Sequence, residues 1–267
     1  MTPLGNEGLK PIKTRLDLLL VEQGLAGSRP KAQGLILAGQ ILVDGRKVEK
    51  CGALVSSEAA LRVLGEAPPY VSRGGLKLEA ALGHFGMNPA GKVCLDIGAS
   101  TGGFTDCLLQ QGAIRIIAVD AGTNQLDWKL RTDPRVVSLE KTNARYLERS
   151  AVGEPIDLVT VDVSFISATL ILPVIPALLK PQAEVLVLAK PQFEVGRGQV
   201  GKGGVVRDDK LRQEAVARVA CKLGELGFTG IASVPSVLPG ASGNAEYFVH
   251  GTWDGVDAGG NDLQGLA

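Results

Sequence analysis

The 267-residue sequence has few cysteines, few aromatic residues and only two histidines. Its four cysteines show no C-x-x-C spacing and no histidine at metal-ligand distance, which argues against a structural zinc site. We therefore expect no bound metal, and we expect the thiols to be reduced in a reducing compartment. The cysteines are Cys51, Cys94, Cys107 and Cys221.

The sequence also lacks a segment suited to a membrane or to secretion. Residues 1–14 have no apolar stretch of the kind found in a secretory signal. The most apolar stretch, residues 165–179, is too short to span a bilayer and contains two prolines. We therefore expect a soluble cytoplasmic protein with no membrane partner.

No charge of one sign dominates the chain, since 28 basic residues balance 28 acidic residues. Hydrophobic residues make up 45% of the sequence and charged residues 21%, so one large or two smaller domains can bury a core. The two charges are not evenly distributed, since residues 1–92 carry 12 basic against 8 acidic residues.

A glycine-rich turn is the most informative feature that is present. Residues 93–97 form a short apolar run typical of a covered parallel strand, and the glycines that follow permit a tight turn and close backbone approach. A second strand pattern, residues 114–119, ends in Asp120, where a nucleoside-binding α/β fold places an acceptor for ribose hydroxyls.

The spacing of the turn favours one cofactor over another. It has the form Asp96-x-Gly98-x-x-x-Gly102-Gly103, whereas dinucleotide folds use G-x-G-x-x-G. An acid at the strand end suits a ligand with a cationic amine and repels a pyrophosphate, so S-adenosyl-L-methionine is favoured over NAD. A glycine-rich turn without a ligand is the alternative.

Residues 14–64 form a separate pattern of two helices, at about 15–24 and 28–39, followed by a hairpin around Asp44-Gly45. This order resembles the alpha-L RNA-binding module that pseudouridine synthases share. Basic residues on one face would then contact RNA phosphates, although a solvated charged face is the alternative. The candidate RNA-binding residues are Arg15, Arg29, Lys31, Arg46 and Lys47.

Residues 65–72 are predicted to be a linker because they contain two prolines and a glycine. A second domain is predicted at 73–253, with a flexible tail at 254–267. Its alternating patterns indicate an α/β fold with a Rossmann-like parallel sheet covered on both faces. Strands are expected near 93–97, 114–119, 136–139, 156–161, 183–189, 228–237 and 245–250, and helices near 74–85, 103–111, 124–132, 166–180 and 208–226.

Four ionisable residues lie at or near the ends of these elements. Asp162 and Lys190 each directly follow a strand pattern, Glu246 lies beside the last strand, and Lys77 lies on the first helix of the domain. Together they could serve methyl transfer to a hydroxyl, because a neighbouring cation lowers the pKa of a lysine and the acids position the donor amine and the substrate. Taken singly, each is more readily an ion pair at a domain edge.

From about residue 14 to 251 the chain resembles the TlyA family of ribosomal RNA 2′-O-methyltransferases, also called the hemolysin A family. The resemblance rests on the segments 72–78, 96–106, 162–167, 190–194 and 243–247. It implies an FtsJ-like domain with a Lys-Asp-Lys-Glu tetrad at Lys77, Asp162, Lys190 and Glu246, of which Lys190 is the expected base. It also implies S-adenosyl-L-methionine as donor, cytidine 2′-hydroxyls as acceptors, and ribosomal RNA or ribosomal subunits as partners.

Asn143, after the third strand, could bind the adenine edge of the cofactor, and an equal interpretation makes it a helix cap. A non-catalytic RNA-binding protein would need neither the glycine turn nor the tetrad, and a hemolysin acting on membranes would need a spanning or amphipathic segment. The oligomeric state is left open. The predicted cofactor-binding residues are Asp96, Gly98, Ser100, Gly102, Gly103, Phe104, Asp120, Asn143 and Asp162.

Overall fold

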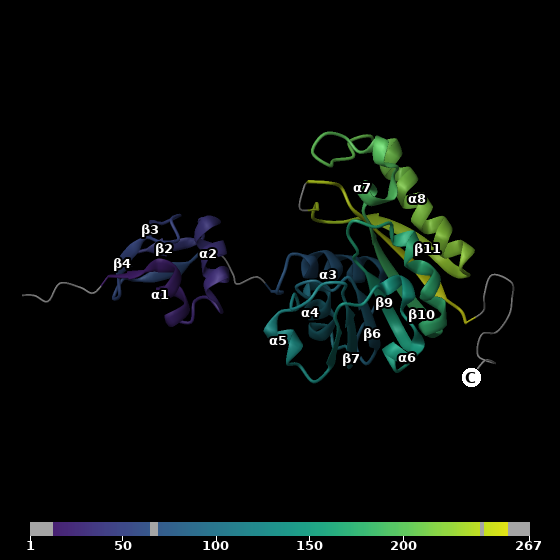
Figure 1. Ribbon diagram of the computed structural model, residues 1–267, viewed down its shortest axis with the longest axis horizontal. Coiled ribbons are helices and arrows are strands. Elements are labelled where there is room, and N and C mark those ends of the chain that lie inside the picture. The colour runs from purple at the N-terminus through teal and green to yellow at the C-terminus, as the bar shows by residue number, and fades with distance from the viewer. Residues whose placement is uncertain (1–12, 65–68, 241–242, 256–267) are drawn as a thin grey trace, which may run out of the picture. The chain divides into compact units, whose positions relative to one another are not determined.

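The computed structural model describes residues 13–64, 69–240 and 243–255. The chain forms two compact units, Met1–Ala67 and Pro68–Ala267 (Figure 1).

The first unit packs two helices with two small antiparallel sheets around a core that includes Leu16, Leu20 and Ile36. The predicted hairpin is confirmed: Asp44 and Gly45 have left-handed φ angles of 49° and 77° and turn β2 into β3. The elements are β1 (Lys13–Arg15), α1 (Leu16–Glu22), α2 (Arg29–Leu37), β2 (Ile41–Val43), β3 (Arg46–Lys47), β4 (Leu54–Ser56) and β5 (Leu61–Val63).

A buried carboxylate joins the two helices of this unit. Asp17, on α1, has no exposed surface and accepts hydrogen bonds from Arg15, from Arg29 Nε at 2.9 Å and from Gln33 Nε2 at 2.9 Å. Two of these donors lie on α2. The hydrogen bond from Arg15, supported by those from Gln33 and Arg29, holds the pKa of Asp17 well below its usual range.

The second unit is built on a seven-stranded sheet with the order β11-β12-β10-β9-β6-β7-β8. The predicted strands form this sheet, but β12 runs antiparallel to both of its neighbours. Residues 236–246 connect β11 to β12, which is too short for the crossover that a parallel pair requires. The strands are β6 (Val93–Ile97), β7 (Arg115–Val119), β8 (Val136–Leu139), β9 (Ile156–Val161), β10 (Leu179–Ala189), β11 (Phe228–Pro235) and β12 (Tyr247–Trp253).

Two apolar cores, one on each face of this sheet, account for the layered arrangement visible in Figure 1. Leu78, Phe104 and Leu130 pack helices α3, α4 and α5 on one face, and Ile171 and Val219 help to pack η2–η4 and α8 on the other. The helices and short helical turns are α3 (Gly74–Phe85), α4 (Gly103–Gln110), α5 (Trp128–Arg131), η1 (Ala144–Tyr146), α6 (Arg149–Val152), η2 (Ala168–Leu170), η3 (Leu172–Val174), η4 (Pro176–Leu178), α7 (Pro191–Glu194), η5 (Arg197–Gln199) and α8 (Asp209–Glu225).

The predicted helix at 166–180 is wrong. The segment forms the three short 3₁₀ turns η2, η3 and η4, because Pro173 and Pro176 lack the N–H that a continuous helix requires. The helix predicted at 124–132 is reduced to α5, since Asn124 has a left-handed φ of 55° that a helix does not accommodate.

The second unit begins within the segment predicted as a linker, residues 65–72. Within the segment predicted as a linker, Tyr70 is buried and the Val71 N–H donates to Asp106 Oδ2 at 2.9 Å, so these residues pack on the second unit. Residues 65–68 of that segment, and 256–267 of the predicted tail, lie outside the described residues.

Replacing Asp17 with asparagine is expected to reduce the free energy of unfolding of the first unit by about 2 kcal/mol, the scale of a hydrogen bond to a charged group. Because folding lowers the pKa of Asp17, this stabilisation is present above the unfolded pKa of about 3.9 and is lost as the pH falls further. Amide hydrogen exchange over residues 16–43 of the full chain measures the change. Glu49→Gln, at an exposed carboxylate, is the control, and equal protection in both variants would contradict the assignment.

Candidate active site

The loops that follow β6 and β9 touch through their backbones. Gly98 has a φ of 86°, and a Cβ atom at this position would lie 2.4 Å from the carbonyl oxygen of Asp162. The Asp162 N–H also donates to Ile97 O at 2.8 Å. Only glycine fits here, so the predicted glycine turn exists and places Asp162 directly beside it.

Asp120 holds the turn from the other side. It follows β7, and its Oδ2 accepts a hydrogen bond from the Ser100 N–H at 2.8 Å, while its Oδ1 accepts from the Gly122 N–H at 2.7 Å. Each carboxylate oxygen can accept a second hydrogen bond. Asp120 therefore both orders the turn and presents acceptors at the carboxyl end of the sheet.

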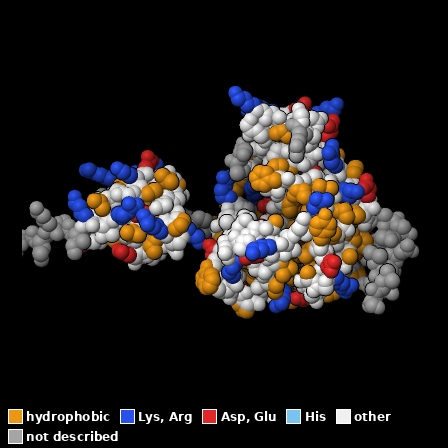
Figure 2. Space-filling view, viewed as in Figure 1, with side chains coloured by type: hydrophobic (Ala, Val, Ile, Leu, Met, Phe, Trp, Pro, Cys, Tyr) orange, Lys and Arg blue, Asp and Glu red, His pale blue; other side chains and the backbone are white. Residues whose placement is uncertain are grey.

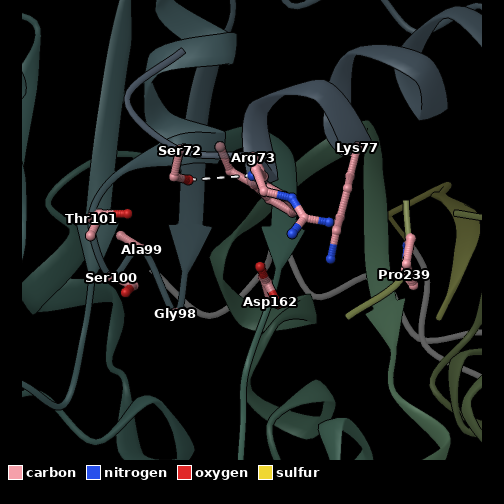
Figure 3. Close-up of a pocket in the computed structure, with 12 residues that line it drawn as sticks. Ser72, Arg73, Lys77, Gly98, Ala99, Ser100, Thr101, Asp162 and Pro239 are labelled. Atoms are coloured by element: carbon pink, nitrogen blue, oxygen red, sulfur yellow. Dashed lines mark hydrogen bonds between the residues drawn. The ribbon is translucent and has the colours of Figure 1, made fainter. Parts of the chain in front are cut away.

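A cleft of about 430 Å³ opens above these loops. In Figure 3, Arg73 and Lys77 extend from α3 toward Asp162, and residues 98–101 lie across the cleft from them. This volume suits a small organic ligand. The lining residues are Ser72, Arg73, Gly74, Lys77, Gly98, Ala99, Ser100, Thr101, Gly103, Phe104, Asp162 and Pro239.

The four predicted catalytic residues form two lysine–carboxylate pairs. Lys77 Nζ lies 2.6 Å from Glu246 Oε2, and Lys190 Nζ lies 2.6 Å from Asp162 Oδ1. Lys190 also donates to Ser164 Oγ at 2.9 Å. The exposed fraction of these four side chains is between 4% and 25%. The sequence predicts that the charge of Lys77 acts on Lys190, but in the structure Glu246 compensates the charge of Lys77.

The two pairs depend on different parts of the fold. Asp162 and Lys190 follow the adjacent parallel strands β9 and β10, so their meeting is a direct result of strand order. Glu246 instead directly precedes the antiparallel strand β12. Its side chain lies against Gly240, and a Cβ atom on Gly240 would be 2.3 Å from Glu246 Oε1.

Four of the predicted cofactor residues do not line the cleft, and Asp120, which lies behind the turn that it orders, is one of them. Asp96 has no exposed surface, and its carboxylate accepts hydrogen bonds from Thr105 at 2.7 Å and Thr160 at 3.0 Å. A Cβ at Gly102 would lie 2.2 Å from Leu130 Cδ1, so this glycine faces the core. Asn143 Oδ1 accepts from the Arg145 N–H at 3.1 Å and caps η1, as the capping interpretation expected.

Two exposed residues at this end of the sheet were not among those predicted from the sequence: Arg73, in the lining of the cleft, and Phe165, in the loop after β9. Arg73 precedes α3 as an exposed cation in the lining. In the sequence, the glycine pair Gly74-Gly75 directly after Arg73 could have indicated this residue. Phe165 is 92% exposed, has a left-handed φ of 66°, and lies 5.4 Å from the ring of Phe193. A large apolar side chain held outward in a strained backbone is a mark of a binding surface.

The five predicted RNA-binding residues of the first unit have exposed or half-exposed side chains, and Figure 2 shows Lys and Arg side chains on the visible face of this unit. Arg15 and Arg29 have a structural role as well, since both pair with buried Asp17. Lys47 lies 3.2 Å from Glu49. Part of the positive charge is therefore compensated within the unit.

Among the described residues, no helix is long and apolar enough to cross a membrane. Within the same residues, no group of three or more His, Cys, Asp or Glu side chains is arranged to hold a metal ion.

Burial raises the pKa of Asp96 to about 6, so its ionisation opposes folding. The stability that protonated Asp96 provides is present below the unfolded pKa of about 3.9 and is lost as the pH rises through about 6. Asp96→Asn should remove this dependence, changing the slope by up to about 1.4 kcal/mol per pH unit. Urea unfolding of both proteins from pH 4 to 8 tests this; stability curves that stay parallel from pH 4 to 7 would contradict it.

Comparison with known proteins agrees with this geometry. A family model for the FtsJ-like methyltransferase matches residues 70–253, and one for the S4 domain matches residues 14–60. The 16S/23S rRNA (cytidine-2′-O)-methyltransferase TlyA of Mycobacterium tuberculosis is 49% identical over 238 residues, 89% of each chain. Hemolysin A of Brachyspira hyodysenteriae is 45% identical, over 88% of this chain and 98% of its own.

A solved structure from Streptococcus thermophilus, provisionally described as a hemolysin, shares 41% identity and superposes with a TM-score of 0.71 over 92% of this chain and 90% of its own. The resemblance found in the sequence is thus confirmed over both units. The chain belongs to the TlyA family, in which an S4 domain precedes an FtsJ-like methyltransferase domain.

Proposed function

We propose that this chain transfers a methyl group from S-adenosylmethionine to the 2′-hydroxyl of a cytidine in ribosomal RNA, in the cytoplasm. The observation that carries the proposal is the Lys190–Asp162 pair, which lies at the carboxyl ends of β9 and β10 beside the glycine turn. The acceptor is suggested by the 49% identical relative, whose name specifies cytidine 2′-oxygens of 16S and 23S rRNA.

The chemistry of the cleft suits this cofactor, which supplies an electrophilic methyl group on a sulfonium ion. Asp120 can accept hydrogen bonds from ribose hydroxyls. Phe104 and Ala99 provide apolar lining for an adenine ring. Asp162 lines the cleft with 25% of its side chain exposed, so beyond its ion pair with Lys190 its carboxylate can accept a hydrogen bond from a ligand amine. The cation of Arg73 suits a carboxylate or a phosphate.

Proton removal is assigned to Lys190. A 2′-hydroxyl must lose its proton as it attacks, and a positioned amine within reach can accept it. In the structure Lys190 Nζ lies 2.6 Å from Asp162 Oδ1. The sulfonium cofactor is a cation, so on entering the cleft it would compete with Lys190 for Asp162. The pair Lys77–Glu246 supplies a second cation at the cleft that can hold the RNA backbone or the hydroxyl oxygen.

The first unit is assigned to substrate binding. Its match to the S4 domain and its exposed side chains Lys31, Arg46 and Lys47 support contact with RNA phosphates. A non-catalytic RNA-binding protein would have no use for the two lysine–carboxylate pairs in the second unit. A membrane-acting hemolysin, which the names of two relatives suggest, receives no support from the helices of the described residues.

Asp120→Ala is expected to weaken binding of S-adenosylmethionine by about 1–3 kcal/mol, since the hydroxyls lose their acceptor and the Ser100 and Gly122 N–H groups lose theirs. Titration calorimetry with the full chain measures the affinity. Asp133→Asn, at a surface acid paired with Arg135, is the matched control and should bind normally. Equal affinity in all three proteins would remove Asp120 from the cofactor site.

Lys190→Ala is expected to abolish methyl transfer while leaving binding of cofactor and RNA intact. Lys190→Arg should fail too, because a guanidinium keeps its charge but cannot be deprotonated in a protein. The measurement is transfer of labelled methyl groups to each ribosomal subunit, followed by mapping of 2′-O-methylated nucleotides. Lys180→Ala, at the opposite end of β10, is the matched control and should retain turnover.

Two outcomes would correct the proposal. Substantial activity of Lys190→Arg would show that this position acts only as a cation. Absence of 2′-O-methylation of any ribosomal RNA by the wild-type protein would remove the proposed acceptor.

A further inference from the structure

The two loops that carry Asp162 and Lys190 extend beyond the paired part of their strands. The register of β9 and β10 ends with the pair Val161 and Val187. Beyond this point the two loops contact each other through side chains. Residues 162–168 follow β9, and residues 190–194 follow β10.

Three side chains of the second loop contact the first loop in sequence order. Lys190 contacts Asp162 and Ser164, the Phe193 ring lies 5.4 Å from the Phe165 ring, and Glu194 contacts the loop further along. Lys190 is the N-cap residue of the short helix α7, with an extended backbone, and Phe193 and Glu194 are the last two residues of that helix. Residues at both ends of α7 thus contact the loop after β9.

Glu194 is the buried member of this series. It is 3% exposed, and its carboxylate accepts hydrogen bonds from Ser167 Oγ and, at 2.7 Å, from the Ala168 N–H. Its own backbone carbonyl accepts from Arg218 Nη1 at 2.7 Å, which ties α7 to α8. Glu194 is therefore held at two points: its carboxylate binds the loop after β9, and its backbone carbonyl binds α8.

The loop after β9 is consequently anchored at both ends. At its start the Asp162 N–H donates to Ile97 O, and at its end Ser167 and Ala168 donate to Glu194. Between these anchors lies Phe165 with its left-handed φ of 66°. Such a backbone is strained in a non-glycine residue and persists only when the surroundings impose it.

From this geometry we infer that Glu194 is a positioning residue for catalysis, whose buried carboxylate fixes the loop after β9 against α7 and so sets the Lys190–Asp162 contact. Glu194 lies outside the lining of the cleft and acts through Lys190, Asp162 and Ser164. The catalytic meaning of this role rests on the proposed function, whereas the positioning itself is a property of the fold.

The positioning can be measured without substrate, by the rate at which acetic anhydride acetylates individual lysines of the full chain, followed by mass spectrometry. Lys190 and Lys77 form a matched pair, because they are 11% and 12% exposed and each lies 2.6 Å from a carboxylate. Glu194→Ala should accelerate acetylation of Lys190 several-fold and leave Lys77 at its wild-type rate. A general loosening of the domain would accelerate both.

Two further variants guard against misfolding. Ser167→Ala removes one hydrogen bond to the carboxylate and should shift Lys190 in the same direction by a smaller factor. Glu194→Gln keeps the length of the side chain and an oxygen for the Ala168 N–H, and its amide can donate to Ser167 Oγ, so it should restore a rate near that of the wild type.

In methyl transfer, Glu194→Ala should lower kcat on the order of tenfold to a hundredfold, the scale of a small misplacement of a reacting group, while the affinity for S-adenosylmethionine stays unchanged. Equal acetylation of Lys190 in wild type, Glu194→Ala and Ser167→Ala would overturn the inference. A wild-type protein that methylates no RNA would instead count against the proposed function, and the acetylation result would still decide the role of Glu194.

Discussion

The contact on which the rest of the site depends is the one between the backbones of Gly98 and Asp162. It allows no side chain at residue 98, and the hydrogen bond from the Asp162 N–H to Ile97 O fixes the two loops in register. The glycine turn and Asp162, the first of the two carboxylates proposed for the site, are therefore a single structural unit. The cleft floor, the orientation of Asp162 and, through Asp162, the place of Lys190 all follow from this contact.

The residues that strand order brings together were predictable from the sequence. Parallel strands end at one edge of a sheet, so polar residues at the ends of apolar runs, such as Asp120, Asp162 and Lys190, were expected near one another. The element types were also clear wherever periodicity was strong and glycine or proline marked the ends, as for α2 and the hairpin at Asp44-Gly45. Lys77 and Glu246 were also singled out near element ends, but their pairing depends on an antiparallel strand that spacing alone did not reveal.

What the sequence could not show was the direction in which a side chain points. Asp96 belongs to the same motif as Gly98, but strand alternation and the two threonines that bond to it turn its carboxylate into the core. Arg15 and Arg29 fit a basic RNA-binding face, yet both converge on a buried acid 2 and 12 residues away. Pro173 and Pro176 interrupt the helix that the apolar pattern of residues 166–180 otherwise suggests. For Asp96, Arg15 and Arg29 a specific tertiary partner outweighed the local pattern.

The antiparallel hairpin of β11 and β12 has a consequence for the order in which the site is made. Chains are synthesised from the N-terminus, and N-terminal parts fold first. The glycine turn, Asp162 and Lys190 all precede residue 200, whereas Glu246 arrives with the last strand of the sheet. Until that strand docks, Lys77 has no carboxylate partner and the cleft has no wall at Pro239. A nascent or truncated chain that lacks the last strand can therefore form the glycine turn and the Lys190–Asp162 pair, but it lacks the Lys77–Glu246 pair of the proposed site.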